Sequence, residues 1–413
     1  MVSPVTYRDS IVGEDEIKNC ISYVSSFRFS SFSGKEWRFE FEPKQYCRWV
    51  CDSVTRKPVS FASPNLEETR RYLETLGVGD YLLAGMTGEG FVAVTDCAAS
   101  RPLFVLRTGN GTEVVTNRLP NEPSGFLVEI VPGDTLLMLN PLGQTNCTFQ
   151  AAAWPSQPDE STLLDRLKLS LERRVYGKSK VAVSFSGGLD SSLIAHLVSR
   201  KLSSRPRLIL VTTYAKGYSD SVIPRRAAEM LDLELVEVPL EAEGCMQIIK
   251  GAGSRILWKS SMDAAIAIGF AAASSAARAL GCENLLAGQG ADEFFGGYRK
   301  YERVLHEPAL LIQAMDKDQK SLYKGLARDA EAIRDGGCDP CFPYLDRVVI
   351  DYAKSIPANL RIKNGVRKAA LREAAIQAGV PEAIAYAPKK AFQYSSGLEK
   401  MVRKLFTPFL VRG

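Results

Sequence analysis

Hydrophobic and polar positions follow two different rhythms along this chain. From about Lys35 to Asn140, short apolar runs alternate with polar positions and are broken by Gly-Glu-Gly, Gly-Asn-Gly and Pro-Gly turns. Alternation over a few residues is typical of strands with one buried face, and glycine-rich breaks favour tight hairpins. We therefore predict hairpins and an antiparallel sheet in the first part of the chain.

The second rhythm begins after a polar stretch, "WPSQPDESTLL", which starts at Trp154 and predicts a linker followed by a helix. The β-runs "KVAVSFS" and "RLILVTTY" then alternate with helical segments such as "SSLIAHLVSRKL", and the chain beyond Tyr298 is mostly helical in pattern. Strand–helix alternation produces a parallel sheet with helices on its faces. The predicted fold class is α/β, with a small β-rich domain over residues 1–155 and a parallel-sheet domain over residues 160–413.

Composition narrows the class of protein. The chain has 413 residues and a net charge of +5, which is too small an excess to favour nucleic acid as a partner. The polar start, "MVSPVTYRDS", lacks the apolar core of a signal peptide, and no apolar run reaches the roughly 18 residues of a membrane span. These features predict a soluble, cytoplasmic protein without a membrane partner.

The nine cysteines do not indicate a disulfide framework or a zinc site. An odd number in a long chain without an export signal disfavours a disulfide framework. Two pairs are close in sequence, Cys47 with Cys51 and Cys338 with Cys341, but two histidines and no second C-x-x-C leave a four-ligand zinc site improbable. A redox or disulfide role for Cys338 and Cys341 stays open.

The segment "SFSGGLDSSL", from Ser184 to Leu193, joins a predicted strand to a predicted helix. Glycines let the backbone approach a ligand, and free N–H groups at a helix start favour an anion. The hydroxyls of Ser186, Ser191 and Ser192 add donors, whereas the spacing differs from that of a Walker loop. Asp190 suits Mg²⁺, which bridges phosphate oxygens. The segment therefore predicts a phosphate site with a magnesium ion.

The same residues resemble a known family. S-G-G-L-D-S-S is similar to the pyrophosphate loop of the ATP pyrophosphatases, and "GQGADEFFGGYRKY" (Gly288–Tyr301) resembles a segment of asparagine synthetases and their β-lactam-forming relatives. Three later segments match the family in the same order: "FPYLDR" (Phe342–Arg347), "RKAALREA" (Arg367–Ala374) and "PKKAF" (Pro388–Phe392). The resemblance covers about Leu163 to Tyr394.

The resemblance implies an ATP-dependent amide ligase that adenylates a carboxylic acid, with aspartate the default, releases pyrophosphate and then combines the acid with ammonia. It implies Asp190 and Asp292 as ligands of Mg²⁺ and Lys389 as the cation near the α-phosphate. The residues implied in ATP binding are Ser184, Ser186, Gly187, Gly188, Leu189, Asp190, Ser191, Ser192, Thr213, Ala287, Gly288 and Lys368. Those implied in binding the acid are Gly288, Gly290, Glu293 and Asp339.

Two departures concern the acceptor site. The family has a glutamate where this chain has Gln289, which cannot act as a general base. Asp339 falls where the family has the glutamate of an E-A-R-x-P-F-L-D run and is a candidate replacement, while Cys341 stands at the arginine of that run. Gln289 and Asp339 are therefore candidate catalytic residues, and the acceptor is open.

A third departure concerns the amine source. Glutamine-dependent members begin with a catalytic cysteine, but position 2 here is Val2 and the first cysteine is Cys20. "VTDCAASRPLFV" and "VEIVPGDTLLM" weakly resemble family segments, so the first domain is expected to be a degenerate glutaminase-like domain without its nucleophile. Ammonia would then be free or delivered by a separate glutaminase; a homodimer is possible.

Three alternatives remain. The chain is compatible with a cyclase that forms an amide or β-lactam within another acid. A tRNA-modifying or sulfur-transfer enzyme would use Cys338 and Cys341, although the chain lacks a dense basic patch. A non-catalytic homologue would keep the fold alone, against which the presence of Asp190, Asp292 and Lys389 argues.

Overall fold

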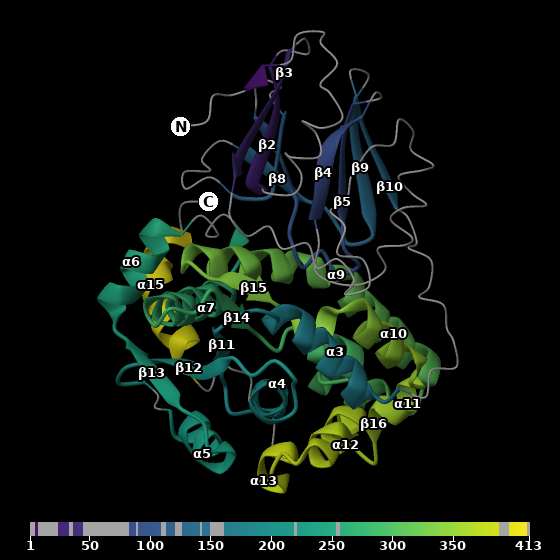
Figure 1. Ribbon diagram of the computed structural model, residues 1–413, viewed down its shortest axis with the longest axis vertical. Helices are drawn as coiled ribbons and strands as arrows, with labels where there is room; N and C mark the ends of the chain where they lie inside the picture. The colour runs from purple at the N-terminus through teal and green to yellow at the C-terminus, as the bar shows by residue number, and fades with distance from the viewer. Residues whose placement is uncertain are drawn as a thin grey trace. The chain divides into compact units, whose positions relative to one another are not determined.

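The computed structural model describes residues 5–6, 24–32, 36–43, 82–87, 90–108, 113–119, 126–140, 143–148, 161–218, 221–252, 257–387 and 396–410. The chain forms two compact units, Met1–Asp159 and Glu160–Gly413 (Figure 1). Each unit has a sheet system of its own. Within the described ranges, no helix has both the length and the apolar character needed to cross a membrane.

The first unit is built from antiparallel strands in two sheets. The six-stranded sheet has the order β1-β3-β2-β7-β6-β8 and the four-stranded sheet the order β10-β9-β5-β4. The predicted hairpins are confirmed, since β4 pairs with β5, β6 with β7 and β9 with β10. The strand bounds are β1 Val5–Thr6, β2 Val24–Phe32, β3 Glu36–Pro43, β4 Leu82–Thr87, β5 Gly90–Thr95, β6 Phe104–Thr108, β7 Glu113–Thr116, β8 Phe126–Ile130, β9 Thr135–Asn140 and β10 Gly143–Thr148.

The second unit contains the parallel sheet, which confirms the predicted α/β fold. Its order is β13-β12-β11-β14-β15, and every neighbouring pair is parallel. The strands are β11 Lys180–Ser184, β12 Arg207–Ala215, β13 Leu235–Leu240, β14 Asn284–Leu286 and β15 Asp339–Cys341. The chain builds outward from β11 in one direction and resumes on its other side with β14. The loops that follow β11 and β14 therefore flank the point where the strand order reverses, which is where open α/β sheets bind ligands.

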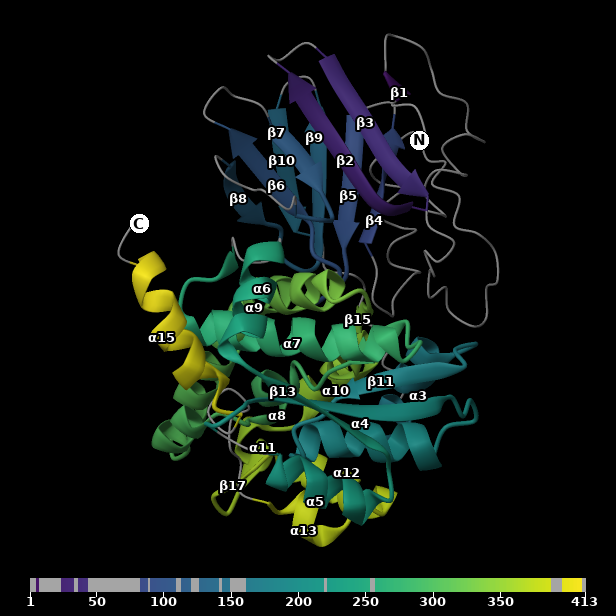
Figure 2. The same cartoon turned by 90° about the vertical axis from the view of Figure 1, so that its left-hand side faces the viewer.

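Helices cover both faces of this sheet. α7 (Ser261–Ala279) and α9 (Pro308–Asp335) lie on one side, and α4 (Leu189–Arg200) and α5 (Val222–Leu231) on the other (Figure 2). α7 is rich in buried alanines, whose small side chains let it pack closely against both the sheet and α9. The remaining elements are α3 Leu163–Val175, α6 Ala242–Gly251, α8 Ala291–Phe295, η2 Arg299–Val304, η3 Pro343–Leu345, α10 Arg347–Ser355, α11 Ala358–Arg361, β16 Ile362–Lys363, β17 Val366–Arg367, α12 Ala369–Ala378, α13 Glu382–Ala385 and α15 Leu398–Leu410.

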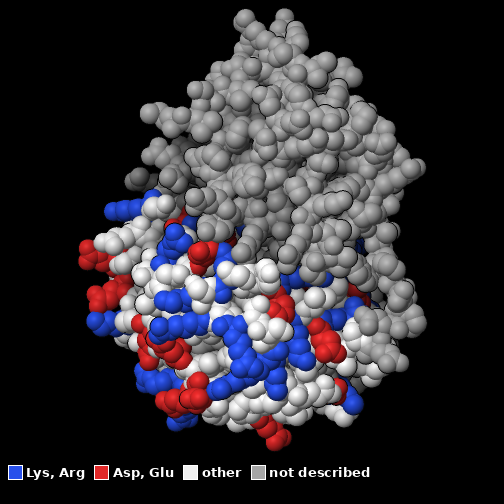
Figure 3. Space-filling model, viewed as in Figure 1, with Lys and Arg blue, Asp and Glu red and all other residues white. Residues whose placement is uncertain are grey.

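The surface of the second unit carries both signs of charge. Lys and Arg side chains gather near the middle of the face shown in Figure 3, with Asp and Glu side chains around them. Several charges of the second unit form exposed pairs, such as Arg200 with Asp232 and Arg207 with Glu234. Exposed pairs contribute little to stability because water screens them, so burial in the core holds this unit together.

Candidate functional site

The loop between β11 and α4 is shaped for close approach of a ligand. Gly187 has a φ of +72°, and a β-carbon there would lie 2.9 Å from the carbonyl oxygen of Ile223. Gly188 is the N-cap of α4 and has no side chain to accept a hydrogen bond from the first N–H groups of the helix. The hydroxyls of Ser186 and Ser191 lie 3.2 Å apart, and that of Ser191 donates to the Gly188 carbonyl at 3.3 Å. The donors predicted from the sequence are thus gathered in one turn.

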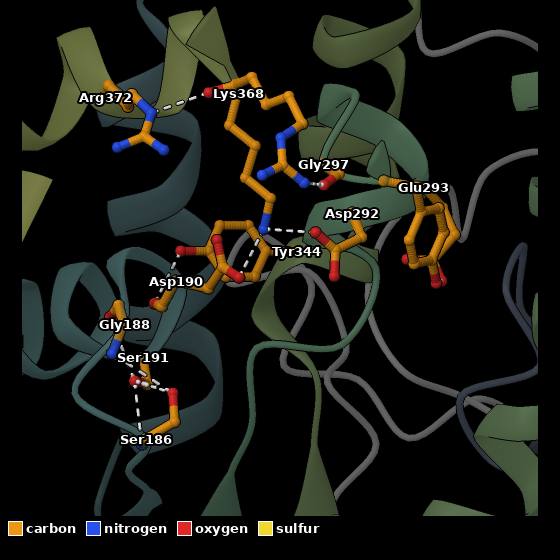
Figure 4. A network of polar contacts seen from close by, with 12 residues as sticks. Ser186, Gly188, Asp190, Ser191, Asp292, Glu293, Gly297, Tyr344, Lys368 and Arg372 are labelled. Carbon is orange, nitrogen blue, oxygen red and sulfur yellow. Dashed lines mark hydrogen bonds and ion pairs between the residues drawn. The ribbon is translucent and has the colours of Figure 1, made fainter. Parts of the chain in front are cut away.

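Two acids from neighbouring strands meet at this edge of the sheet. Asp190 lies in the first turn of α4, after β11, and Asp292 in the first turn of α8, after β14. The Lys368 ammonium lies between them, with Nζ 2.6 Å from Oδ2 of Asp190 and 2.7 Å from Oδ1 of Asp292 (Figure 4). The structure therefore brings together the two acids that the sequence placed in separate loops.

Lys368 is held in an unusual environment. It is only 3% exposed and stands at the start of α12 with a φ of 58°, a left-handed conformation that is rare outside glycine. Burial disfavours its charged form, but Asp190 and Asp292 outweigh that effect and raise the pKa of the ammonium. Strained, buried cations of this kind concentrate at functional sites.

The acid pair also fits a magnesium ion. Oδ1 of Asp190 is buried and accepts no hydrogen bond from any described residue. The same part of the chain holds no group of three or more His, Cys, Asp or Glu side chains that could form a complete metal cage. Mg²⁺ is typically held by one or two carboxylates with phosphate oxygens and water completing the octahedron. Asp190 and Asp292 would hold it.

Glycines let the two loops approach each other. A β-carbon at Gly288 would lie 3.0 Å from Cβ of Asp190, so the chain leaving β14 packs directly against the first turn of α4. Gly290 has a φ of +90°, and a β-carbon there would lie 2.2 Å from a methyl carbon of Leu345. Ala287, between β14 and these glycines, is 1% exposed and donates its N–H to the carbonyl of Cys341.

Other predicted residues lie deeper. Glu293 is 8% exposed, accepts a hydrogen bond from the Tyr298 hydroxyl, and has its pKa raised by burial. Ser192 is fully buried, and its hydroxyl has no partner among the described residues. Thr213 is also buried, near the end of β12, with its hydroxyl 3.5 Å from the Gly269 carbonyl. Leu189 is the first residue of α4 and is buried, and Ser184 is the last residue of β11.

Three residues with an expected role are not part of the proposed site. Asp339 begins β15 opposite Asn284, and its N–H donates to the carbonyl of Glu283, so it lies at the amino end of the strands, whereas the acids meet at the carboxyl end. Asp339 is therefore not a residue of the proposed site. Cys338 and Cys341 are both buried, each only 2% exposed. Burial raises the pKa of Cys338, the opposite of what a reactive thiol needs.

Some assignments fall outside the described residues. They are Lys389, with its neighbours in "PKKAF", and Val2, Cys20, Cys47 and Cys51 in the first unit.

No role was predicted for several residues that the structure places at the site. The Tyr344 hydroxyl donates to the carbonyl of Asp190 at 2.9 Å, and Arg372 donates to the carbonyl of Arg367, which precedes Lys368 (Figure 4). Both belong to segments that matched the family pattern, so the resemblance marked these segments but assigned no role to the two residues. Asp329, on α9, accepts a hydrogen bond from the side chain of Gln289, and no local pattern pointed to it.

The sequence of this chain matches a known protein family. The asparagine synthase family model matches residues 162–336 and 336–410. The chain belongs to the asparagine synthase family. Among related members, a provisionally named glutamine-hydrolyzing asparagine synthetase of Methanocaldococcus jannaschii is 34% identical over 60% of this chain and 52% of its own length.

Two further members of the asparagine synthase family are more distant. An asparagine synthetase domain-containing protein of Saccharomyces cerevisiae is 28% identical over 57% of this chain and 50% of its own length. The glutamine-hydrolyzing asparagine synthetase of Mus musculus is 24% identical over 81% of this chain and 62% of its own length. The chain thus spans between half and two thirds of the length of these relatives.

Proposed function

We propose that this protein is an ATP-dependent carbon–nitrogen ligase that adenylates a carboxylic acid, releases pyrophosphate, and joins the acid to an amine. The observation that carries the proposal is the meeting of Asp190 and Asp292 on one buried cation beside the glycine loop of β11. A lone glycine loop would suit any phosphate. A loop with two convergent acids suits a phosphate chain that arrives with a divalent cation.

The residues divide the work of the first step. The free N–H groups at the start of α4 and the hydroxyls of Ser186 and Ser191 would bind phosphate oxygens of ATP. Mg²⁺, when bound by Asp190 and Asp292, would neutralise charge on the phosphate chain. Lys368 would move from the acids toward the departing pyrophosphate, whose negative charge grows as the bond to the α-phosphorus breaks. A positive charge brought to that point as the bond breaks stabilises the transition state more than the ground state.

The second step needs positioning more than acid–base chemistry. The acyl-adenylate already has a good leaving group, so an amine held beside its carbonyl carbon attacks and expels AMP. Aspartate and ammonia are the substrates we test first, with ammonia free or supplied by a separate glutaminase. Lys389, by resemblance to the family, would assist at the α-phosphate.

The test is an assay of the full chain with ATP, Mg²⁺ and ammonia across a panel of acids that includes aspartate, with pyrophosphate and AMP measured. We expect release that depends on one acid and produces equal amounts of AMP and amide. Asp190→Asn and Asp292→Asn should each abolish release. Pyrophosphate release that requires tRNA would favour the tRNA-modifying alternative. The absence of pyrophosphate release with every acid and with tRNA would refute the proposal.

A further inference from the structure

The short helix η3, Pro343–Leu345, is buried and held in place by α3. The hydroxyl of Ser170, on α3, donates to the carbonyl of Pro343 at 2.7 Å. Asp346, directly after η3, pairs with Arg174 of the same helix at 2.9 Å. Because both ends of η3 are tied to α3, its side chains are firm supports for whatever they contact.

The hydroxyl of Tyr344 connects η3 to the acid that follows β11. Tyr344 is fully buried, and its hydroxyl donates to the carbonyl oxygen of Asp190 at 2.9 Å (Figure 4). A carbonyl within a helix ordinarily accepts one hydrogen bond, from the N–H four residues later, so the hydroxyl is a second donor to this oxygen. Because the contact is with the backbone, it restrains the first turn of α4 and leaves the carboxylate of Asp190 to face Lys368.

The ring of Tyr344 connects η3 to the acid that follows β14. α8, which carries Asp292, has five residues and is too short to be stable without tertiary packing. Its Phe295 is 1% exposed and meets the Tyr344 ring edge to face, with the ring centroids 6.3 Å apart. The neighbouring Leu345 lies against Gly290, at the start of α8. The position of Asp292 therefore depends on packing against η3.

We propose that Tyr344 is a positioning residue that fixes the spacing of Asp190 and Asp292 and thereby sets the affinity of the site for a divalent cation. Its hydroxyl holds the backbone of one acid, and its ring supports the helix of the other. The inference deepens the proposed ligase function and rests on it, because that function assigns a divalent cation to the two acids. Groups that orient the ligands of a metal contribute to its affinity without touching it.

Lys368 tolerates a change in this spacing better than a metal ion does. Its Nζ lies 2.6 Å from Asp190 and 2.7 Å from Asp292, at the end of a flexible four-carbon stem. Mg²⁺ demands near-ideal octahedral geometry from its ligands. Without the hydroxyl of Tyr344, the Asp190 carbonyl still has its helical N–H partner. We therefore expect the loss of this hydroxyl to weaken cation binding more than it weakens the fold.

The experiment uses Tyr344→Phe, which removes the hydroxyl and keeps the ring. Mn²⁺ is the probe, because its electron paramagnetic resonance signal distinguishes free from bound ion. It is titrated into the full chain with α,β-methylene-ATP, which resists cleavage between the α and β phosphates, and a titration without protein corrects for metal on free nucleotide. Tyr344→Phe should raise the Kd for Mn²⁺ about three- to tenfold, which is the value of one ordinary hydrogen bond.

Tyr301→Phe is the matched control. Tyr301 is also fully buried, but its hydroxyl donates to Oδ2 of Asp318 on α9, at 2.6 Å, and not to an acid of the site. This variant loses the same chemical group, so its Tm should fall while its Kd for Mn²⁺ stays at the wild-type value.

Steady-state rates supply a second readout. Pyrophosphate release by Tyr344→Phe should fall at limiting Mg²⁺ by about the factor that its Kd for Mn²⁺ rises. At saturating Mg²⁺ the rate should return to within about twofold of the wild type, because the hydroxyl acts on metal binding and not on the chemical step. A defect that saturating Mg²⁺ does not relieve would contradict a role in metal binding.

The outcomes separate the two proposals. Wild-type affinity for Mn²⁺ in Tyr344→Phe overturns this inference and leaves the ligase function standing. An equal loss of affinity in Tyr301→Phe also overturns it, because the effect would then follow general stability. Wild-type protein that binds Mn²⁺ no better than Asp190→Asn, or that releases no pyrophosphate with any acid, overturns both.

Discussion

A β-carbon added at Gly297 would lie 1.8 Å from Oδ1 of Asp292 and 2.3 Å from Cε of Lys368. Both neighbours are ends of flexible side chains, but they are tied to each other by an ion pair of 2.7 Å. The backbone of Gly297 has no positive φ, so alanine is compatible with its conformation. The glycine is therefore required by the site and not by the fold.

We predict that Gly297→Ala separates Asp292 from Lys368 and lowers the rate of pyrophosphate release at least tenfold, at a cost in unfolding free energy of about 1 kcal/mol from overpacking. Steady-state rates and urea unfolding measure the two effects. Gly244→Ala, in α6 with no atom within 4 Å, is the control and should leave the rate unchanged. Equal rates for both variants would refute the requirement.

The sequence was sufficient to bring Asp190 and Asp292 together. Each follows a short apolar run and a glycine turn, and parallel neighbours place the ends of such runs at one edge. Lys368 was expected at the site only from the family resemblance, because its ammonium arrives from 178 residues beyond Asp190 through a left-handed residue that no local pattern predicts.

The sequence pattern also did not reveal β15 or the contact of Asp329 with Gln289, because both depend on residues that are distant in the sequence. β15 has three residues, "DPC", after two glycines, and pairs only because β14 presents an open edge. Asp339 was a candidate by family resemblance alone, and the pairing of β15 with β14 places it at the amino end of the strands. Every residue of α9 from Leu326 to Ile333 is buried. Asp329 therefore does not belong to an exposed polar face that a sequence pattern could indicate. Its contacts with Arg328 and Gln289 are seen only in the folded chain.

Lys368→Met should make the protein dependent on magnesium for stability. Removal of the ammonium leaves two carboxylates facing each other, and loss of one partner from a buried ion pair costs about 3–5 kcal/mol. Mg²⁺ would replace the missing charge, so it should raise the Tm of the variant more than that of the wild type. Thermal unfolding with and without Mg²⁺ measures this, with the exposed Lys320→Met as control. Equal shifts in all three proteins would contradict the magnesium site.

His196 should make the second unit less stable in mild acid. Burial, aided by the neighbouring Lys201 and Arg200, lowers the pKa of the imidazole below its ordinary 6.5, despite a hydrogen bond to the Ala378 carbonyl at 2.8 Å. The unfolded chain then binds a proton that the folded chain does not. The stability that the neutral ring contributes is therefore complete above pH 6.5 and lost as the pH falls through the folded pKa.

His196→Gln keeps a donor for the Ala378 carbonyl but cannot titrate. Between about pH 7.5 and about pH 5, the variant should lose less unfolding free energy than the wild type. Urea unfolding at a series of pH values measures the difference, and His306→Gln serves as the second-histidine control. Parallel pH curves for the wild type and His196→Gln would show that the ring does not link protonation to folding.

Asp346 joins α3 to α10 through a buried charge. It is fully buried, and its two oxygens lie 2.9 Å from Nη1 of Arg174 and 3.4 Å from Nη1 of Arg173. Asp346→Asn keeps an acceptor for the first turn of α10 but leaves both guanidinium groups without their charge partner, which should cost about 3–5 kcal/mol of unfolding free energy. Asp232→Asn is the control, because its pair with Arg200 is exposed and asparagine tolerates the left-handed backbone there. In urea unfolding, equal midpoints for the two variants would mean that packing alone holds these helices together.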